Sequence, residues 1–199
     1  MGAARFSIGI DLGTTNSAIA FVPLTQDAAS EVMAVAQWDS PTTLADPLTL
    51  PSFLYLPDDA TAGSFRRQAF GTGDWIAGLL ARRKAGEQPG RVAHSVKSWL
   101  CHHAVDRDAP ILPWGSDEVA AAQKVSPVQA SALLLAHLRS AWNARFGAAG
   151  AAFAFDAQDI TLAVPASFDA AAQRLTLAAA ERAGFPAHVR LLEEPQAAF

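Results

Sequence analysis

The sequence reads GIDLGTTNS from Gly9 to Ser17, between two apolar runs at Phe6–Ile10 and Ala18–Val22. Two short apolar segments around a glycine-containing connection are typical of two strands joined by a tight turn. Gly13 would give such a turn a positive φ, and Asn16 tolerates the same conformation. A turn with no further role is therefore one interpretation of this segment.

The same segment also has the chemistry of an anion-binding loop. Successive amides in a glycine turn can form a nest for an anion, and Thr14 and Thr15 add hydroxyl donors. Asp11 either accepts hydrogen bonds from the turn or, because it would repel phosphate directly, implies Mg²⁺ held through water. The spacing matches neither G-x-x-x-x-G-K-[ST] nor G-x-G-x-x-G. Gly13, Thr14, Thr15 and Asn16 are thus candidate phosphate-binding residues, and Asp11 is a candidate metal-binding and catalytic residue.

The composition is that of a globular chain. It has 199 residues, of which 51% are hydrophobic and 17% charged, and a net charge of -4 at pH 7. This length suits one domain with a sizeable core, or one divided into two subdomains. We expect no nucleic-acid binding, which favours a basic face, and no membrane span, which needs about 20 apolar residues. The single cysteine, Cys101, and the lack of a signal-peptide pattern predict a cytoplasmic protein.

Local patterns predict the other strands and helices. Further strands are expected at Val32–Ala36, Ser52–Leu56, Ile160–Val164 and Val189–Leu192. Helices are expected at Asp74–Lys84, from Ser126 to Gly147, at Asp169–Ala183 and from Glu194 onward. Val92–Leu100 is ambiguous. The second helix is the best marked, because Ser126, a following proline and Gln129 form a capping-box pattern.

Several ordered blocks resemble the DnaK-type seventy-kilodalton heat-shock chaperones. Ile8–Ser17 resembles the first phosphate loop of the wider actin, sugar-kinase and heat-shock superfamily. Val164–Asp169, with Gln173-Arg174 and Ala183–Phe185 after it, resembles the chaperone pattern V-P-A-x-F…Q-R…A-G-L. Two more matches are Arg190–Ala198, similar to R-[IL]-[IL]-x-E-P-T-A-A, and Pro51–Phe53, similar to P-S-V. The region from about 60 to 150 matches only loosely.

The resemblance implies an α/β fold, lobe I of an actin-like (ribonuclease H-like) ATPase domain. A mixed sheet flanked by helices would be formed by residues 1–37 and about 125–199, with a smaller inserted subdomain at about 38–124. The chain would end before lobe II. The implied ligands are ATP or ADP and Mg²⁺, with Asp11, Thr14 and Thr15 on the first phosphate loop. Glu194 matches the carboxylate that helps to hold the Mg²⁺ water shell and to position the attacking water. By itself, Glu194 would be an acid at a helix start, favoured by the helix dipole.

One departure from the family concerns a lysine. The family carries it in a segment like I-G-D-x-A-K, whereas the nearest stretch here is Phe70–Ala77, which has none. Arg82 or Arg83 could reach in from a longer helix, but the register does not favour this. A fixed positive charge near the γ-phosphate is a large catalytic contribution. We therefore expect slow or absent ATP hydrolysis.

A second departure concerns the residues that relay nucleotide state to the neighbouring domain. Pro165 matches the family's relay proline, but Gln173 occupies the position of the family's arginine and Arg174 follows it. One residue turns a helix by about 100°. Arg174 is thus either a relay residue or a surface arginine.

Two other features are expected to be structural. Trp75, Trp99 and Trp114 are expected to pack in the core or between subdomains. Cys101-His102-His103, with its neighbouring aspartates, fits no closed zinc pattern.

Three functions are compatible with these sequence patterns. The first is the ATP-binding part of a heat-shock chaperone-like protein, whose lobe closure is coupled to a C-terminal region outside the chain. Its partners would be nucleotide and, through regions outside the chain, unfolded polypeptide or co-chaperones. The others are a sugar-type kinase of the same superfamily and a nucleotide-sensing module that does not hydrolyse ATP. The isolated chain is expected to bind ATP weakly and to be inactive.

Overall fold

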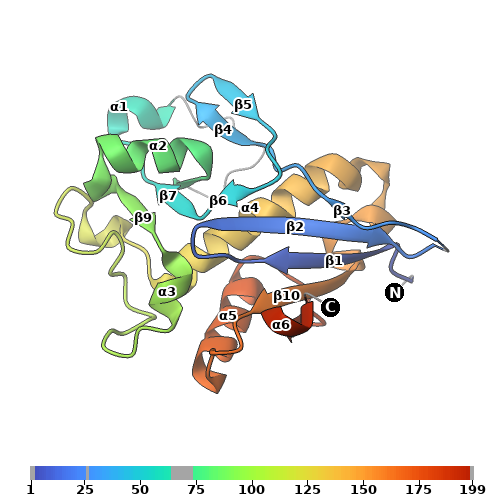
Figure 1. The fold of residues 1–199 in the computed structure, drawn as a ribbon. Helices are drawn as coiled ribbons and strands as arrows, with labels where there is room; N and C mark the ends of the chain where they lie inside the picture. The colour runs from blue at the N-terminus through green and yellow to red at the C-terminus, as the bar shows by residue number, and fades with distance from the viewer. Residues whose placement is uncertain (1–2, 26, 64–73, 198–199) are drawn as a thin grey trace.

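A mixed sheet forms the centre of the molecule (Figure 1). The computed structural model describes residues 3–25, 27–63 and 74–197. The strands of the sheet are β1 (Phe6–Asp11), β2 (Asn16–Pro23), β3 (Glu31–Val32), β10 (Asp159–Val164) and β11 (Arg190–Glu193). Their order is β11-β10-β1-β2-β3, and β6 (Leu50–Pro51) pairs with the start of β2.

The directions of the strands determine where the candidate residues meet. β1, β10 and β11 are parallel to one another, whereas β2 is antiparallel to β1. Asp11 lies beside Ala163, and Ala163 lies beside Leu192. The carboxyl ends of the three parallel strands therefore lie at one edge of the sheet, although they come from opposite ends of the chain.

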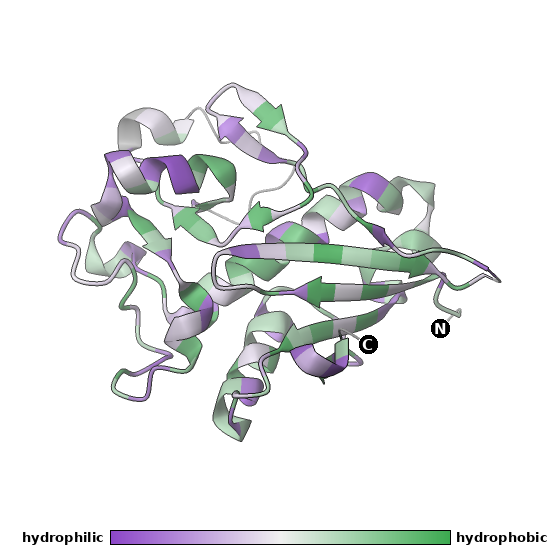
Figure 2. Ribbon diagram, viewed as in Figure 1, coloured by the Kyte–Doolittle hydropathy of each residue, from purple (hydrophilic) through white to green (hydrophobic). Residues whose placement is uncertain are grey.

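The two longest helices, α4 and α5, pack on the sheet. The helices are α1 (Asp59–Ala62), α2 (Leu79–Glu87), α3 (Val96–Leu100), α4 (Pro127–Phe146), α5 (Ala170–Arg182) and α6 (Glu194–Ala197). Short 3₁₀ helices are η2 (Pro89–Arg91), η3 (Ala121–Gln123), η4 (Gly147–Ala149), η5 (Ala151–Phe153) and η6 (Phe155–Ala157). Ile8 and Ile10 are buried with Leu134 and Trp142 of α4, which explains the alternation along β1. Figure 2 shows mainly apolar residues along the large sheet and a strongly hydrophilic stretch on α2.

The predicted capping box is present, and a second helix also has a side-chain cap. The Ser126 hydroxyl accepts from the Gln129 amide at 3.1 Å, and the Gln129 side chain accepts from the Ser126 amide at 3.1 Å. This confirms the capping box, and Gly147 is the C-cap residue. At α5, Asp169 accepts from the Ala172 amide.

Residues 37–63 and 74–124, which we call the insert, contribute two small sheets beside the central one, in addition to β6. β4 (Gln37–Ser40) pairs with β5 (Thr43–Ala45), and β7 (Phe53–Tyr55) pairs with β8 (Ile76–Ala77) and β9 (Val92–His94). A small apolar cluster includes Tyr55, Leu80 and Val92. Other insert residues, such as Leu54 and Val96, belong to the main core, so the insert and the central sheet share buried contacts.

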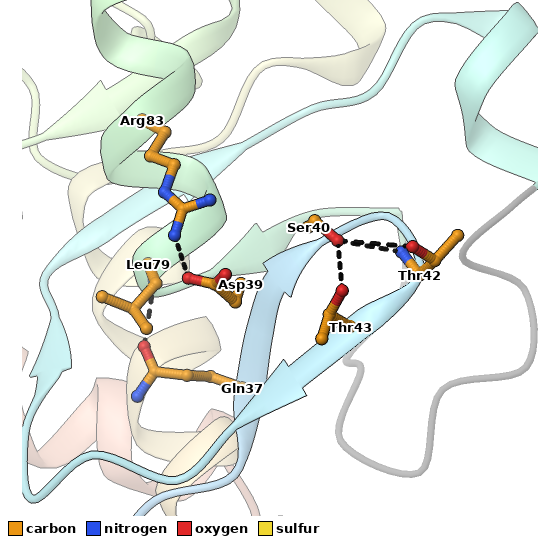
Figure 3. Close-up of polar contacts among 7 residues, drawn as sticks. All are labelled: Gln37, Asp39, Ser40, Thr42, Thr43, Leu79 and Arg83. Atoms are coloured by element: carbon orange, nitrogen blue, oxygen red, sulfur yellow. Dashed lines mark hydrogen bonds and ion pairs between the residues drawn. The ribbon is translucent and has the colours of Figure 1, made fainter.

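A buried glutamine holds α2 against the β4–β5 hairpin (Figure 3). Gln37 is fully buried, and its carbonyl oxygen accepts from the Leu79 amide at 2.9 Å. Its amide group donates to two main-chain carbonyls at 3.1 and 3.0 Å. An ion pair between Arg83 and Asp39 joins the same two elements.

Several predicted boundaries were wrong. The helix expected at Asp74–Lys84 begins only at Leu79, because Ile76–Ala77 pair with β7 and Gly78 has φ 97°. The strand expected at Val32–Ala36 pairs only at Glu31–Val32. The ambiguous Val92–Leu100 divides into β9 and α3. Part of the stretch 70–77, at 70–73, lies outside the described residues.

No helix in the described part of the chain is long and apolar enough to cross a membrane.

Candidate functional site

The predicted phosphate loop is the connection between β1 and β2. Gly13 lies within it, but its φ is not in the positive range, so this part of the prediction was wrong. A Cβ at this position would lie 2.0 Å from the Asn16 carbonyl oxygen. Glycine is therefore required here because another part of the loop approaches closely, not because of a left-handed conformation.

The buried hydroxyl groups of Ser17 and Ser52 support this loop. The Ser52 hydroxyl donates to the Gly13 carbonyl at 2.7 Å and lies 3.0 Å from the Ser17 hydroxyl. The Ser52 amide donates to the Thr15 carbonyl at 2.9 Å. Ser17 and Ser52 have no solvent exposure. The Pro51–Phe53 block, which the sequence offered only as a family match, is therefore a direct structural support of the loop.

The outer side of the loop is open to solvent. Thr14 and Thr15 are exposed, and Asn16 is half-buried at the start of β2. The main-chain amides of Thr14 and Thr15 donate to no acceptor among the described residues. Exposed hydroxyls and free amides are the donors that an anion-binding loop requires.

Two carboxylates and one ammonium group come together at the carboxyl edge of the sheet. Asp11 ends β1, and Glu194 directly follows β11. The Lys97 ammonium donates to a Glu194 oxygen at 2.5 Å, and Lys97 is only 8% exposed. Desolvation raises the pKa of Asp11 above its usual value; the positive charge of Lys97 opposes this rise and the negative charge of Glu194 adds to it. The three groups are thus in electrostatic contact.

Lys97 was not predicted as a site residue from the sequence. It lies in α3, a helix of five residues inside the ambiguous segment, and no motif distinguished it from the other lysines. The arginines that were considered instead are elsewhere: Arg82 is exposed on α2, and Arg83 pairs with Asp39 in the insert. The cation beside the two carboxylates comes from α3.

The residues present fit Mg²⁺ and a phosphate chain. Carboxylate oxygens are ligands that Mg²⁺ accepts, while it keeps several waters and binds phosphate oxygens. In the described part of the chain, no three His, Cys, Asp or Glu side chains are grouped to hold a metal. Asp11 and Glu194 could therefore hold Mg²⁺ only together with further ligands such as waters, and the donors of the β1–β2 loop could bind a phosphate.

Pro165 and Arg174, the two candidate relay residues, lie in different surroundings. Pro165 follows β10 and is half-buried, and its carbonyl accepts from the Phe168 amide at 3.0 Å. On α5 the Gln173 side chain is directed back toward the Phe168 carbonyl, at 3.4 Å, whereas Arg174 is exposed. The offset of one residue thus separates the two side chains as helix geometry requires.

The three tryptophans differ in burial. Trp75 is buried in the main core, and Trp99 packs partly against it. Trp114 is 60% exposed, and its ring centroid is 5.1 Å from that of Trp99. The expectation of buried packing was therefore wrong for Trp114, which lies on the surface of the insert.

Comparison with known proteins agrees with this architecture. The model of the family described as Hsp70 protein matches residues 7–199. The chain is 35% identical over 205 residues to the chaperone protein HscA of Edwardsiella ictaluri (strain 93-146), covering 98% of this chain and 28% of that protein. It is 32% identical over 205 residues to the HscA homolog of Paracidovorax citrulli (strain AAC00-1), with the same coverage. It is 33% identical over 205 residues to HscA of Serratia proteamaculans (strain 568), again with 98% and 28% covered.

The chain belongs to the Hsp70 family. Its mixed sheet and helices form a lobe of the actin-like ATPase fold, as predicted. The chain spans about 28% of the length of these relatives. The sugar-kinase alternative is not favoured.

Proposed function

We propose that this chain forms one wall of a Mg-ATP site in an Hsp70-type chaperone. Gly13, Thr14, Thr15 and Asn16 would bind the phosphates of ATP or ADP. Asp11 and Glu194 would hold Mg²⁺ through its waters. The opposite wall would come from a second lobe, so the isolated chain would bind nucleotide weakly.

The observation that carries this proposal is the convergence at the carboxyl edge of the sheet. Asp11, at the end of β1, and Glu194, after β11, interact electrostatically beside the exposed glycine loop. The two carboxylates repel one another, and the one positive charge of Lys97 balances only one of their two negative charges. Asp11 and Glu194 would hold a metal ion through its waters, and such an ion would supply positive charge that neutralises the phosphates.

The site also bears on hydrolysis. Water attack on the γ-phosphorus would form a new P–O bond and break the bond to the oxygen that bridges to the β-phosphate, with ADP leaving and the proton passing to solvent or phosphate. Glu194 would orient that water. The expectation of slow hydrolysis rested on the absence of a lysine near the γ-phosphate, and Lys97, which lies on Glu194, could supply that positive charge. We also propose that the whole protein hydrolyses ATP and couples this hydrolysis to the binding of unfolded polypeptide, together with co-chaperones.

We also propose that Pro165 and Arg174 relay the nucleotide state to a neighbouring domain. Pro165 directly follows β10, at the edge where Asp11 and Glu194 lie, so it could move with the nucleotide. Arg174 is exposed and could contact a neighbouring domain. The Arg174→Ala variant would then lose coupling between nucleotide and client binding without losing ATP binding.

Calorimetry with Mg-ATP tests the site. The full-length protein should bind Mg-ATP, whereas residues 1–199 alone should bind it weakly. Asp11→Asn should weaken binding of ATP in the presence of Mg²⁺ more than in its absence, because the carboxylate acts through the metal. Glu31→Gln, an exposed acid on the edge strand β3, is the matched control. Equal effects of the two substitutions would refute the metal role of Asp11.

A further inference from the structure

A hollow on the surface of the insert is lined by two tryptophan side chains. It has a volume of about 470 Å³ and lies between η2, β9, α3 and the loop 112–118, which we call the tryptophan loop. Trp99 packs partly against the main core, and Trp114, whose ring centroid is 5.1 Å away, is 60% exposed. Sites for small ligands in proteins have volumes of about 300–1,000 Å³. A hollow of this size beside an exposed tryptophan is typical of a surface that binds a partner.

Hydrogen bonds hold the tryptophan loop in place. Leu112 and Val125 exchange two main-chain hydrogen bonds, each of 3.0 Å. The Ser116 hydroxyl donates to the Gly90 carbonyl at 2.5 Å, and the Lys124 ammonium donates to the Ser116 carbonyl at 2.6 Å. A loop that is already ordered loses little conformational freedom on binding, so more of the energy of its contacts appears as affinity. The wall of the hollow is therefore prepared for a partner before that partner arrives.

The charges that line the hollow are negative. Asp117 and Glu118 are exposed in its wall, and neither forms an ion pair in the part of the chain that the structure describes. No lysine or arginine is among the described lining residues. The cations nearby have main-chain partners: Arg91 donates to three carbonyls, one of them that of Glu118, and Lys124 donates to that of Ser116. A cationic group that enters the hollow would thus meet two carboxylates and an aromatic surface.

We propose that this hollow binds an arginine side chain presented by a partner polypeptide. A guanidinium group is planar and weakly hydrated, so it stacks on an aromatic face and donates paired hydrogen bonds to a carboxylate. Trp114 would supply the aromatic face, and Asp117 and Glu118 would accept the hydrogen bonds. The hollow shares no residue with the proposed Mg-ATP site, so this inference does not depend on the proposed function.

Fluorescence anisotropy with the full-length protein tests the inference. The probe is a labelled glycine–serine peptide that carries arginine, and a second probe carries citrulline, which has a similar shape without the charge. The arginine probe should bind about fivefold more tightly than the citrulline probe. Trp114→Ala should weaken binding of the arginine probe about fivefold, because it removes the aromatic face. Asp117→Asn combined with Glu118→Gln should also weaken it and remove most of its salt dependence between about 50 and 300 mM.

The matched controls are exposed residues of the insert that lie outside the hollow. Leu44→Ala removes another large apolar side chain, which is 47% exposed on β5, and Asp46→Asn removes another exposed carboxylate. Both variants should bind the arginine probe as the wild type does, because neither residue lines the hollow. Mg-ATP binding in Trp114→Ala should equal that of the wild type, which also shows that this variant is folded.

Three results would overturn the inference. Equal affinity for the two probes would show that the charge is not recognised, and unchanged affinity in Trp114→Ala would place the binding elsewhere in the protein. A glutamate-carrying probe that binds more tightly than the arginine probe would contradict the charge argument. Sedimentation without a probe tests a second copy of the chain as the occupant: a dimer that dissociates in Trp114→Ala would assign the hollow to self-association instead.

Discussion

Removal of the Ser52 hydroxyl group should destabilise the chain through the loop that it supports. Its single proton is donated to the Gly13 carbonyl, so Ser17 must be the donor in the contact between the two serines. Ser52→Ala therefore leaves two groups without this partner, the half-buried Gly13 carbonyl and the fully buried Ser17 hydroxyl. Each unsatisfied buried group costs about 1–3 kcal/mol. We expect a loss of about 3 kcal/mol in the free energy of unfolding, since the two costs combine.

Urea unfolding of the 199-residue chain, monitored by circular dichroism, measures this loss. A thermal melt of the same variants gives the change in melting temperature. For a chain of this size, a loss of that magnitude lowers the melting temperature by roughly 6–12 °C. Ser131→Ala is the matched control. Ser131 is equally buried, but its hydroxyl donates to the Pro127 carbonyl within α4. Alanine is the better helix former there, so this control should cost less than about 1 kcal/mol.

A second substitution tests the assignment of the donor. Ser17→Ala removes the hydroxyl that Ser52→Ala leaves unpaired, so the double variant should be less destabilised than the sum of the single variants. The reasoning is refuted if Ser52→Ala and Ser131→Ala have the same stability. Strict additivity of Ser17→Ala and Ser52→Ala would refute the proposed chain of hydrogen bonds.

Three other predictions concern glycine, capping and pH. Gly13→Ala should cost about 1–3 kcal/mol and abolish Mg-ATP binding by the full-length protein, because a Cβ would lie 2.0 Å from the Asn16 carbonyl oxygen. Gly147→Ala, where the nearest atom is 3.5 Å away, should be tolerated in the same unfolding and calorimetric measurements. Ser126→Ala should lower the free energy of unfolding by about 1–2 kcal/mol in urea, since it removes a buried N-cap, and an unchanged midpoint would contradict this. The hydrogen bond from a main-chain amide of α5 lowers the pKa of Asp169 below its usual 3.8. Its added stability is thus present above that value and is lost as the pH falls below it. The stability difference between the wild type and Asp169→Asn should therefore be present at about pH 5 and shrink below about pH 4; an unchanged difference across this range would contradict the shift.

The sequence predicted the regular parts of the fold well. The strands around the glycine loop, the strand that ends at Val164 and the helix capped by Ser126 are present because their signals are local. The helix at Asp74–Lys84 was misplaced, because the apolar residues before Gly78 pair with a distant strand. Strand pairing is a tertiary contact that a local pattern does not contain.

The candidate site was predicted in part. Asp11, the glycine loop and Glu194 were found from motifs, and the parallel strands bring the two carboxylates to one edge. The supporting role of Ser52 was not predicted, because serine before a strand has no distinctive pattern. The role of Lys97 was also missed, because no motif distinguishes it from the other lysines of the chain.

The sequence by itself determined the family, the order of the strands along the chain and the chemistry available at the phosphate loop. These depend on residue types at short spacings, which can be read directly. Only the tertiary structure decided that Gly13 is required by close approach to Asn16, that Ser52 supports the loop and that Lys97 neutralises Glu194. Each of these contacts joins groups through space, and burial makes each one matter, because in the absence of water a carbonyl, a hydroxyl or an ammonium group depends on the partner that the fold supplies.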